Sequence, residues 1–106
     1  YRAAYRLDSL DAQTVARVAN IFNSSEQYED ALEVTEKYRL TDTTSLDVNR
    51  QNAKAYCLLE RYPEAIRRYE ALKQAGDRSF LTYYYLGVSY YGDNWFYGAY
   101  DNLKEA

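Results

Sequence analysis

The stretch "RYPEAIRRYEAL", from Arg61 to Leu72, decides how this chain folds. Its apolar residues recur three and four positions apart, which places them on one face of an α-helix. These residues are Tyr62, Ala65, Ile66, Tyr69 and Leu72. The stretch also holds Pro63, the only proline in the chain. Proline is tolerated in the first turn of a helix, where its missing N–H would have no partner, so the pattern predicts a helix over 63–74.

The stretch is one copy of a pattern that recurs every 34 residues without insertion or deletion. A shift of one period superimposes "QYEDALEVTEKY" (27–38) on it, and the next shift brings in "WFYGAYDNLKEA" (95–106). Aromatic residues then align with aromatic residues, and small residues with small ones. The aligned sets are Tyr28, Tyr62 and Phe96; Ala31, Ala65 and Ala99; Phe22, Tyr56 and Tyr90; and Ala19, Ala53 and Gly87. A fixed period of this length predicts stacked helical units.

Each unit is predicted to contain two amphipathic helices, and in the second unit the first helix covers 47–59. With only 4 glycines and 1 proline in 106 residues, the chain has little material for hairpins or long turns. Ser24 followed by Gln27 predicts a capping box at the start of the second helix of the first unit. Glu64 and Arg68, four positions apart, are expected to pair on a solvent-facing side.

A helix–turn–helix unit of this length resembles the tetratricopeptide repeat. The best match to the first helix of that repeat is "YYYLGVSY", in which Gly87 and Tyr90 hold the small and aromatic positions of the family. The best match to the second helix is the opening stretch, through Tyr62, Ala65 and Tyr69. The resemblance covers residues 10–106 and recurs three times along them.

The chain departs from the family pattern mainly where the first two units meet. Thr35 stands where the family has an aromatic residue, and Asn49 and Asn52 stand where it has apolar ones. Asp77 replaces the proline that closes a unit in the family.

The resemblance implies an all-α fold: a right-handed α-α superhelix, or solenoid, of about three helix–turn–helix repeats. It divides a single domain, 1–106, into repeats 10–44, 45–78 and a truncated 79–106, with 1–9 as the end of a preceding helix. Five of the 14 tyrosines are predicted to be core residues. They are Tyr28, Tyr56, Tyr62, Tyr69 and Tyr90.

The residue types argue against an enzyme. The chain has no histidine, which removes the commonest general base and metal ligand. Its single cysteine, Cys57, lies on a predicted helix and is interpreted as a small apolar residue rather than a nucleophile. No glycine-rich phosphate loop or calcium-loop spacing occurs, so no catalytic residue, metal site or cofactor is expected.

Charge and hydropathy narrow the class of partner. A net charge of −3 does not favour nucleic acid, whose phosphates call for a basic excess. No apolar run of about 18 residues is present, so no membrane insertion is expected. The chain begins at Tyr1 and contains no Met, which we interpret as a soluble fragment of a longer protein. The compartment, cytoplasmic or periplasmic, stays open because any signal sequence would lie outside the fragment.

In the tetratricopeptide family the first helices of the units line a concave groove that binds peptides or proteins. Transferred to this sequence, the groove has a polar half with basic residues and an aromatic half. The candidate binding residues are Arg17, Asn20, Arg50, Gln51, Lys54, Tyr84, Tyr85 and Tyr91. One subgroup of the family grips terminal carboxylates with a set of lysine, asparagine and arginine side chains. Here only Asn20 matches that set, so this clamp is not expected.

Two functions remain open at the level of sequence. The first is a non-enzymatic scaffold that binds a peptide or protein segment in the groove. The second is a structural or self-associating segment of a longer solenoid, with homo-oligomers formed through exposed apolar residues of the last helix. Those residues are Tyr97, Tyr100 and Leu103. A third, weaker interpretation is sugar stacking on Tyr84, Tyr85 and Tyr91.

Overall fold

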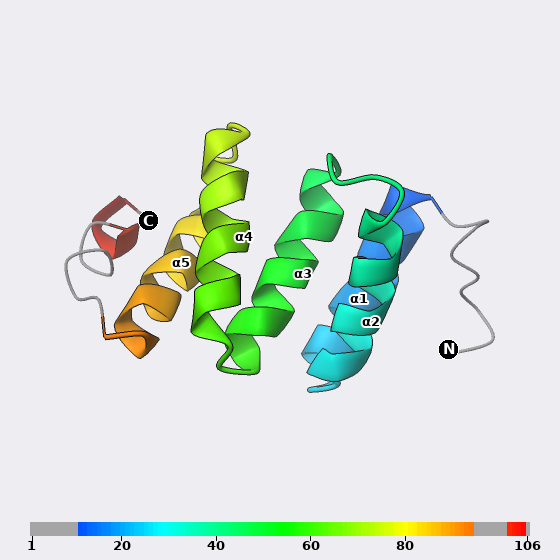
Figure 1. The fold of residues 1–106 in the computed structure, drawn as a ribbon, viewed down its shortest axis with the longest axis horizontal. Coiled ribbons are helices and arrows are strands. Elements are labelled where there is room, and N and C mark those ends of the chain that lie inside the picture. Colours follow the sequence, from blue (N-terminus) through cyan, green and yellow to red (C-terminus); the bar gives the residue numbers. More distant parts are fainter. Residues whose placement is uncertain (1–10, 95–101, 106) are drawn as a thin grey trace.

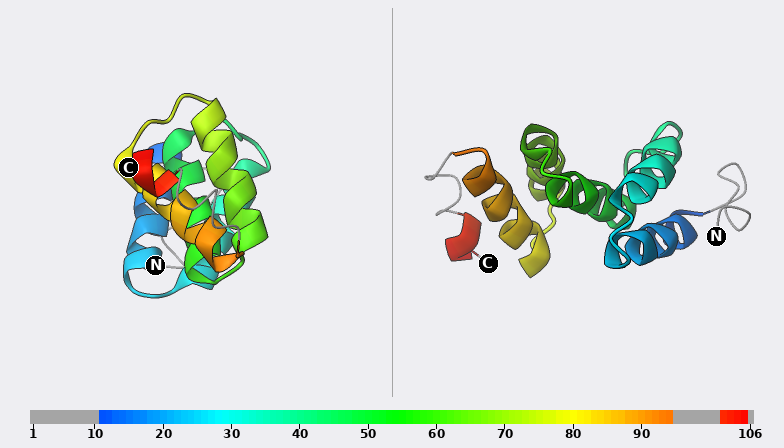
Figure 2. Two further views of the ribbon diagram at one scale, coloured as in Figure 1. Left: turned by 90° about the vertical axis from the view of Figure 1, so that its left-hand side faces the viewer. Right: turned by 90° about the horizontal axis from the view of Figure 1, so that it is seen from below.

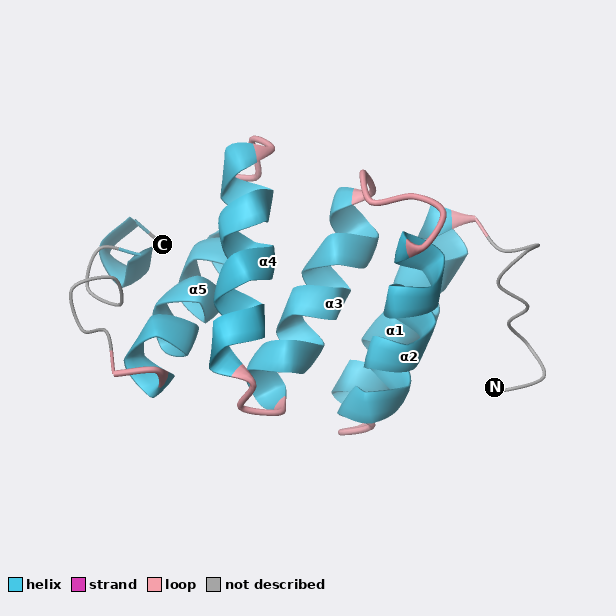
Figure 3. Ribbon diagram, viewed as in Figure 1, coloured by secondary structure: helices cyan, strands magenta, loops and turns pink. Residues whose placement is uncertain are grey.

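The computed structural model describes residues 11–94 and 102–105, and over these ranges it contains helices and no strand. The helices are α1 (Ala12–Ser24), α2 (Tyr28–Arg39), α3 (Leu46–Leu58), α4 (Tyr62–Gln74) and α5 (Phe80–Gly92) (Figure 1, Figure 3). Residues 102–105 form a further helical turn. The predicted all-α class is therefore confirmed for this part of the chain. The helix expected over 1–9 lies outside the described residues.

The helix bounds keep the period seen in the sequence. Three helices, α1, α3 and α5, begin at residues 12, 46 and 80, and α2 and α4 begin at 28 and 62, in each case 34 apart. The turn after the first helix of each unit repeats as well, since Glu26, Glu60 and Asn94 all have positive φ angles of 61–65°. Pro63 lies in the first turn of α4, as predicted, and Gly76 follows the end of α4 with φ 98°.

The helices lie in two layers. Each helix packs on the next one along the chain, and α3 also contacts both α1 and α5, whereas the backbones of α2 and α4 stay apart. Seen from below, α2 and α4 therefore lie on one side, and α3 lies between α1 and α5 on the other (Figure 2). This arrangement gives the first helices of the units a common exposed face.

The core divides into two clusters that meet at α3. One joins α1, α2 and α3 around Val15, Val34 and Val48, and the other joins α3, α4 and α5 around Tyr69 and Leu86. The small residues of the repeat allow the close approach, because Ala19, Ala31, Ala53 and Ala65 are fully buried. Of the tyrosines expected in the core, Tyr69 and Tyr90 are buried, whereas the other three are half-buried and pack against its edge.

Two local predictions were wrong. Ser24 does not cap α2: it is the last residue of α1, and Gln27 precedes α2 without a side-chain cap hydrogen bond. The turn explains this, because the Gln27 N–H bonds back to the Phe22 carbonyl at 2.7 Å and the left-handed Glu26 reverses the chain. Arg68 does not pair with Glu64 either; its ion pair, at 3.3 Å, reaches Glu36 on α2.

Candidate functional site

The shared face of α1, α3 and α5 carries two adjoining hollows. The first, of about 310 Å³, is lined by Gln13, Ala16, Arg17, Asn20, Asp47, Arg50 and Gln51. The second, of about 110 Å³, is lined by Asn20, Arg50, Gln51, Lys54, Tyr69, Leu81, Thr82 and Tyr85. Because Asn20, Arg50 and Gln51 line both, the hollows form one continuous depression, which we call the groove.

Most of the candidate residues from the sequence lie together in this groove. Those lining it are Arg17, Asn20, Arg50, Gln51, Lys54 and Tyr85. The other two, Tyr84 and Tyr91, lie on α5 outside the lining and are 40% and 65% exposed. Tyr84 stacks on Phe80 at 5.8 Å between ring centroids and meets the Tyr85 ring edge-on at 5.3 Å. It thus extends the groove toward an exposed aromatic surface.

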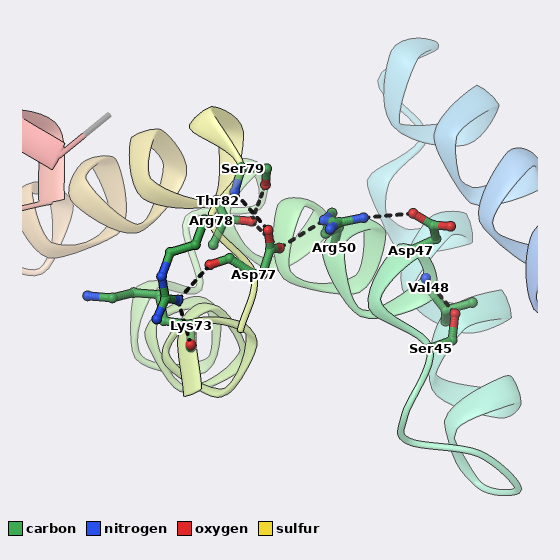
Figure 4. Close-up of polar contacts among 9 residues, drawn as sticks. All are labelled: Ser45, Asp47, Val48, Arg50, Lys73, Asp77, Arg78, Ser79 and Thr82. Atoms are coloured by element: carbon green, nitrogen blue, oxygen red, sulfur yellow. Dashed lines mark hydrogen bonds and ion pairs between the residues drawn. The ribbon is translucent and has the colours of Figure 1, made fainter. Parts of the chain in front are cut away.

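Arg50, at the centre of the groove, is already held by two carboxylates. Its Nε donates to Asp77 Oδ2 at 2.8 Å, and one terminal nitrogen donates to Asp47 Oδ1 at 2.7 Å (Figure 4). The charge of Arg50 is thus largely neutralised by these two carboxylates, and the contact with Asp77 links α3 to the loop before α5. Arg50 therefore has a mainly structural role in the groove.

Asp77 is the hub of this arrangement. Only 3% of it is exposed, and besides Arg50 it accepts hydrogen bonds from the Ser79 backbone N–H and the Thr82 hydroxyl (Figure 4). Burial alone would raise the pKa of Asp77, but these hydrogen bonds outweigh it and hold the pKa well below its ordinary value. In the sequence, Asp77 was noted only because it replaces the proline of the family. The Asp-x-Ser spacing of Asp77 and Ser79 could have predicted its role, because it is typical of a turn in which the Asp side chain accepts a backbone hydrogen bond.

Gln51 also has an internal partner. The side-chain amide of Asn23, which is 4% exposed, donates to the Gln51 carbonyl at 3.2 Å and to its side-chain oxygen at 3.0 Å. These bonds fasten the end of α1 to the middle of α3. Gln51 therefore contributes to the groove wall mainly as a structural element.

Three candidate residues of the groove still have hydrogen-bond donors available for a ligand. Within the described residues, no side-chain hydrogen bond or ion pair involves Arg17, Asn20 or Lys54. Lys54 lies over the Tyr85 ring, with its Nζ 5.7 Å from the ring centroid. A cation held over an aromatic face keeps its N–H donors available, so the groove offers two cations and one amide to a ligand.

The smaller hollow is an apolar slot between α3 and α5. Tyr85 is half-buried and stacks on Tyr69 with centroids 6.3 Å apart, and Leu81 beside it is 54% exposed. Burial raises the pKa of Tyr85 above its ordinary value, so its phenol stays neutral at physiological pH. The slot presents aromatic and aliphatic carbon next to the Lys54 ammonium.

The single cysteine takes no part in the groove. Cys57 is 4% exposed, and its thiol lies 3.9 Å from the Tyr85 carbonyl oxygen. Burial raises the pKa of the Cys57 thiol, which disfavours the reactive thiolate. This burial agrees with the interpretation of Cys57 as a small apolar residue.

Neither a metal centre nor a membrane span is found in the parts of the chain that the structure covers. Over 11–94 and 102–105, no cluster of three metal-ligating side chains is present. Nor is any described helix long and apolar enough to cross a membrane. Of the residues expected to mediate self-association, Leu103 is 42% exposed. Tyr97 and Tyr100 lie outside the described residues.

Comparisons with known proteins add no relative: no family model matches the chain, and no curated protein sequence matches it.

Proposed function

We propose that this chain is a protein-interaction module of the tetratricopeptide type, a right-handed superhelix that binds a segment of another protein in the groove. The observation that carries the proposal is the composition of the groove: free donors from Arg17, Asn20 and Lys54 lie beside an apolar slot. The constant 34-residue spacing of the helices supports the repeat architecture on which it rests.

The groove suits an extended segment that combines acidic and aliphatic side chains. Carboxylates would meet Arg17 and Lys54, two cations of the groove for which no ion pair is found within the described residues. A cavity of about 150 Å³ holds a benzene molecule in an engineered protein, so the slot of about 110 Å³ suits a branched aliphatic side chain better than an indole. Recognition would then depend on one buried aliphatic anchor with charged contacts around it.

A selection from a random peptide library displayed on phage tests this proposal. Peptides enriched on the wild-type chain are expected to lose about tenfold or more in affinity with Lys54→Ala or Leu81→Ala. Leu81 is largely exposed, so its removal leaves the core intact. Arg67→Ala, an exposed change on α4, is the matched control and should leave affinity unchanged. Selected peptides that bind all four proteins equally would overturn the groove as the binding site.

The aromatic residues beside the groove need separate variants. Tyr85 packs against the α3–α5 core and stacks on Tyr69, so its loss would disturb folding as well as binding. Tyr84→Ala alone is the informative variant, because that side chain is 40% exposed.

The exposed apolar side chains of α5 favour self-association as a second candidate function. Phe80, Leu81 and Tyr91 are 59%, 54% and 65% exposed on this one helix. If a second copy covers them, light scattering should show a dimer that Tyr91→Ser weakens and Lys54→Ala does not. A monomer at near-millimolar concentration would exclude this function and leave the groove model untouched.

A further inference from the structure

A second cavity, separate from the groove, opens between α2 and α4. Its volume is about 390 Å³. It is lined by Arg39, Thr43, Thr44, Leu46, Asn49, Arg68, Ala71, Leu72 and Ala75. None of these residues lines the groove. The backbones of α2 and α4 stay apart (Figure 1), and side chains such as Arg68 reach from one helix to the other, which leaves room for this cavity.

Two guanidinium groups line this cavity, and only one of them has a carboxylate. Arg68 pairs with Glu36 at 3.3 Å and donates from Nε to Asn52 Oδ1 at 2.9 Å. Arg39 donates to the neutral Asn49 side chain, and no ion pair links it to a described residue. Its Nε is buried without a hydrogen-bond partner in the described part of the chain. Arg39 is thus a half-buried cation whose neutralisation is incomplete.

The charged groups around Arg39 also leave its positive charge incompletely neutralised. Burial, and then the charge of Arg68, lower the pKa of Arg39, while Glu36 opposes them only in part. The other nearby carboxylate, Asp42, already accepts hydrogen bonds from the Tyr38 hydroxyl and from Thr44. Arg39 is half-buried and its Nε has no partner among the described residues, so the cavity favours a ligand that brings a negative charge.

The remaining walls indicate what could carry that charge. The hydroxyl-bearing residues Thr43 and Thr44 stand on one side, and Leu46, Leu72 and Ala75 supply apolar carbon. A guanidinium presents parallel N–H donors that match the two oxygens of a carboxylate. We propose that this cavity binds a carboxylate on a short aliphatic chain, with Arg39 as its main recognition residue. The carboxylate would belong to a free aliphatic acid or to a Glu side chain of a partner.

Titration of the whole chain with sodium butyrate, followed by amide NMR at constant ionic strength, tests this site. Saturable shifts are expected at the backbone amides of Thr44, Leu46 and Ala75. Arg39→Gln should weaken binding about tenfold or more, because it removes a charge-assisted contact. The control is Arg67→Gln, which removes an exposed arginine of α4 that lines neither the cavity nor the groove and should leave butyrate affinity within about twofold. Shifts that do not saturate, or that persist equally in Arg39→Gln, would overturn the proposal.

A second variant keeps the test decisive if Arg39→Gln unfolds. Ala71 is exposed on α4 and lines the cavity, so Ala71→Leu narrows it with little loss of helix propensity and should weaken the butyrate shifts. N-acetyl-glutamate methylamide, compared with butyrate, distinguishes the two sources: stronger binding by the blocked amino acid assigns the site to a partner's side chain. Saturable binding of inorganic phosphate without butyrate binding would refute the carboxylate assignment.

Discussion

The side-chain amide of Asn52 donates a hydrogen bond of 3.0 Å to the hydroxyl of Thr35, and both side chains are fully buried between α2 and α3. The Thr35 hydroxyl in turn donates a hydrogen bond of 2.7 Å to the Ala31 carbonyl. Asn52 in turn accepts from Arg68. Two residues that each break the apolar pattern of the repeat therefore supply partners for one another, and the buried network is satisfied.

This pairing predicts non-additive effects on stability. Asn52→Ala should lower the free energy of unfolding by about 2–3 kcal/mol, since it removes one hydrogen-bond partner from Arg68 and one from Thr35 and opens a cavity. Thr35→Val should cost about 1 kcal/mol. The double variant should fall short of the sum by about 1 kcal/mol, because the shared bond is lost only once. Urea unfolding measures all three; additivity within about 0.3 kcal/mol would contradict a direct coupling.

The Arg50–Asp77 contact predicts a pH dependence of stability. The folded state holds the pKa of Asp77 below the unfolded value of about 3.9, so folding favours the ionised carboxylate. This stabilisation is fully present above that value and is lost progressively as pH falls through it toward the folded pKa. Asp77→Asn should lower the free energy of unfolding at pH 7 by about 2 kcal/mol, because Arg50 and Thr82 lose an ionic acceptor.

Urea unfolding of both proteins between about pH 7 and pH 2.5 separates Asp77 from the other acids. The pKa values of Glu36 and Asp42 are lowered as well, and both proteins share these groups. The gap between the two stability curves should therefore narrow as the pH falls below about 4. Parallel curves over the whole range would show that Asp77 contributes no ionic stabilisation.

The sequence predicted what depends on local spacing. The helix starts follow from apolar periodicity, and the starts of α3 and α4 were placed within one residue. Pro63 marked the start of α4 correctly because its backbone preference acts within one turn. The gathering of Arg17, Asn20 and Lys54 on one face follows from the repeat register, since the first helices of the units share that face.

The sequence did not predict which charges pair, because those choices depend on how helices approach one another. Arg68 was assigned to Glu64 on its own helix, yet its guanidinium reaches Glu36 across the space between α2 and α4. Arg50 was expected to meet a ligand, yet Asp77, far along the chain, occupies it. The partner of a long side chain depends on which acidic groups the packed helices bring within its reach, and this is seen only in the packed structure.

The left-handed Glu60 provides a test of the turn that separates α3 from α4. Its φ is 62°, and the next N–H, of Arg61, bonds back to the Tyr56 carbonyl at 2.9 Å. Gly76 holds the same place after α4. Glu60→Gly should therefore raise the free energy of unfolding by about 0.5–1 kcal/mol, because glycine adopts this conformation without strain.

The matched control places glycine inside a helix. Arg67→Gly, at an exposed position of α4, should lower stability by about 1 kcal/mol. A melting temperature that falls in both variants would mean that Glu60 is not strained in this turn.

The last turn of α5 is packed against the start of α4. This contact predicts that Gly92→Ala changes stability in opposite directions with and without the Tyr62 ring. A Cβ placed on Gly92 would lie 2.4 Å from the Tyr62 ring carbon Cζ, far inside van der Waals contact. Alanine is otherwise the better helix former by about 1 kcal/mol. The overlap should outweigh that preference, so Gly92→Ala should be destabilising by about 1–2 kcal/mol in the wild-type background. In a Tyr62→Ala background the ring is gone, and the same change should be neutral or stabilising. Chemical unfolding of the four proteins measures both effects, and an equal loss in both backgrounds would show that the Tyr62 ring does not limit the size of residue 92.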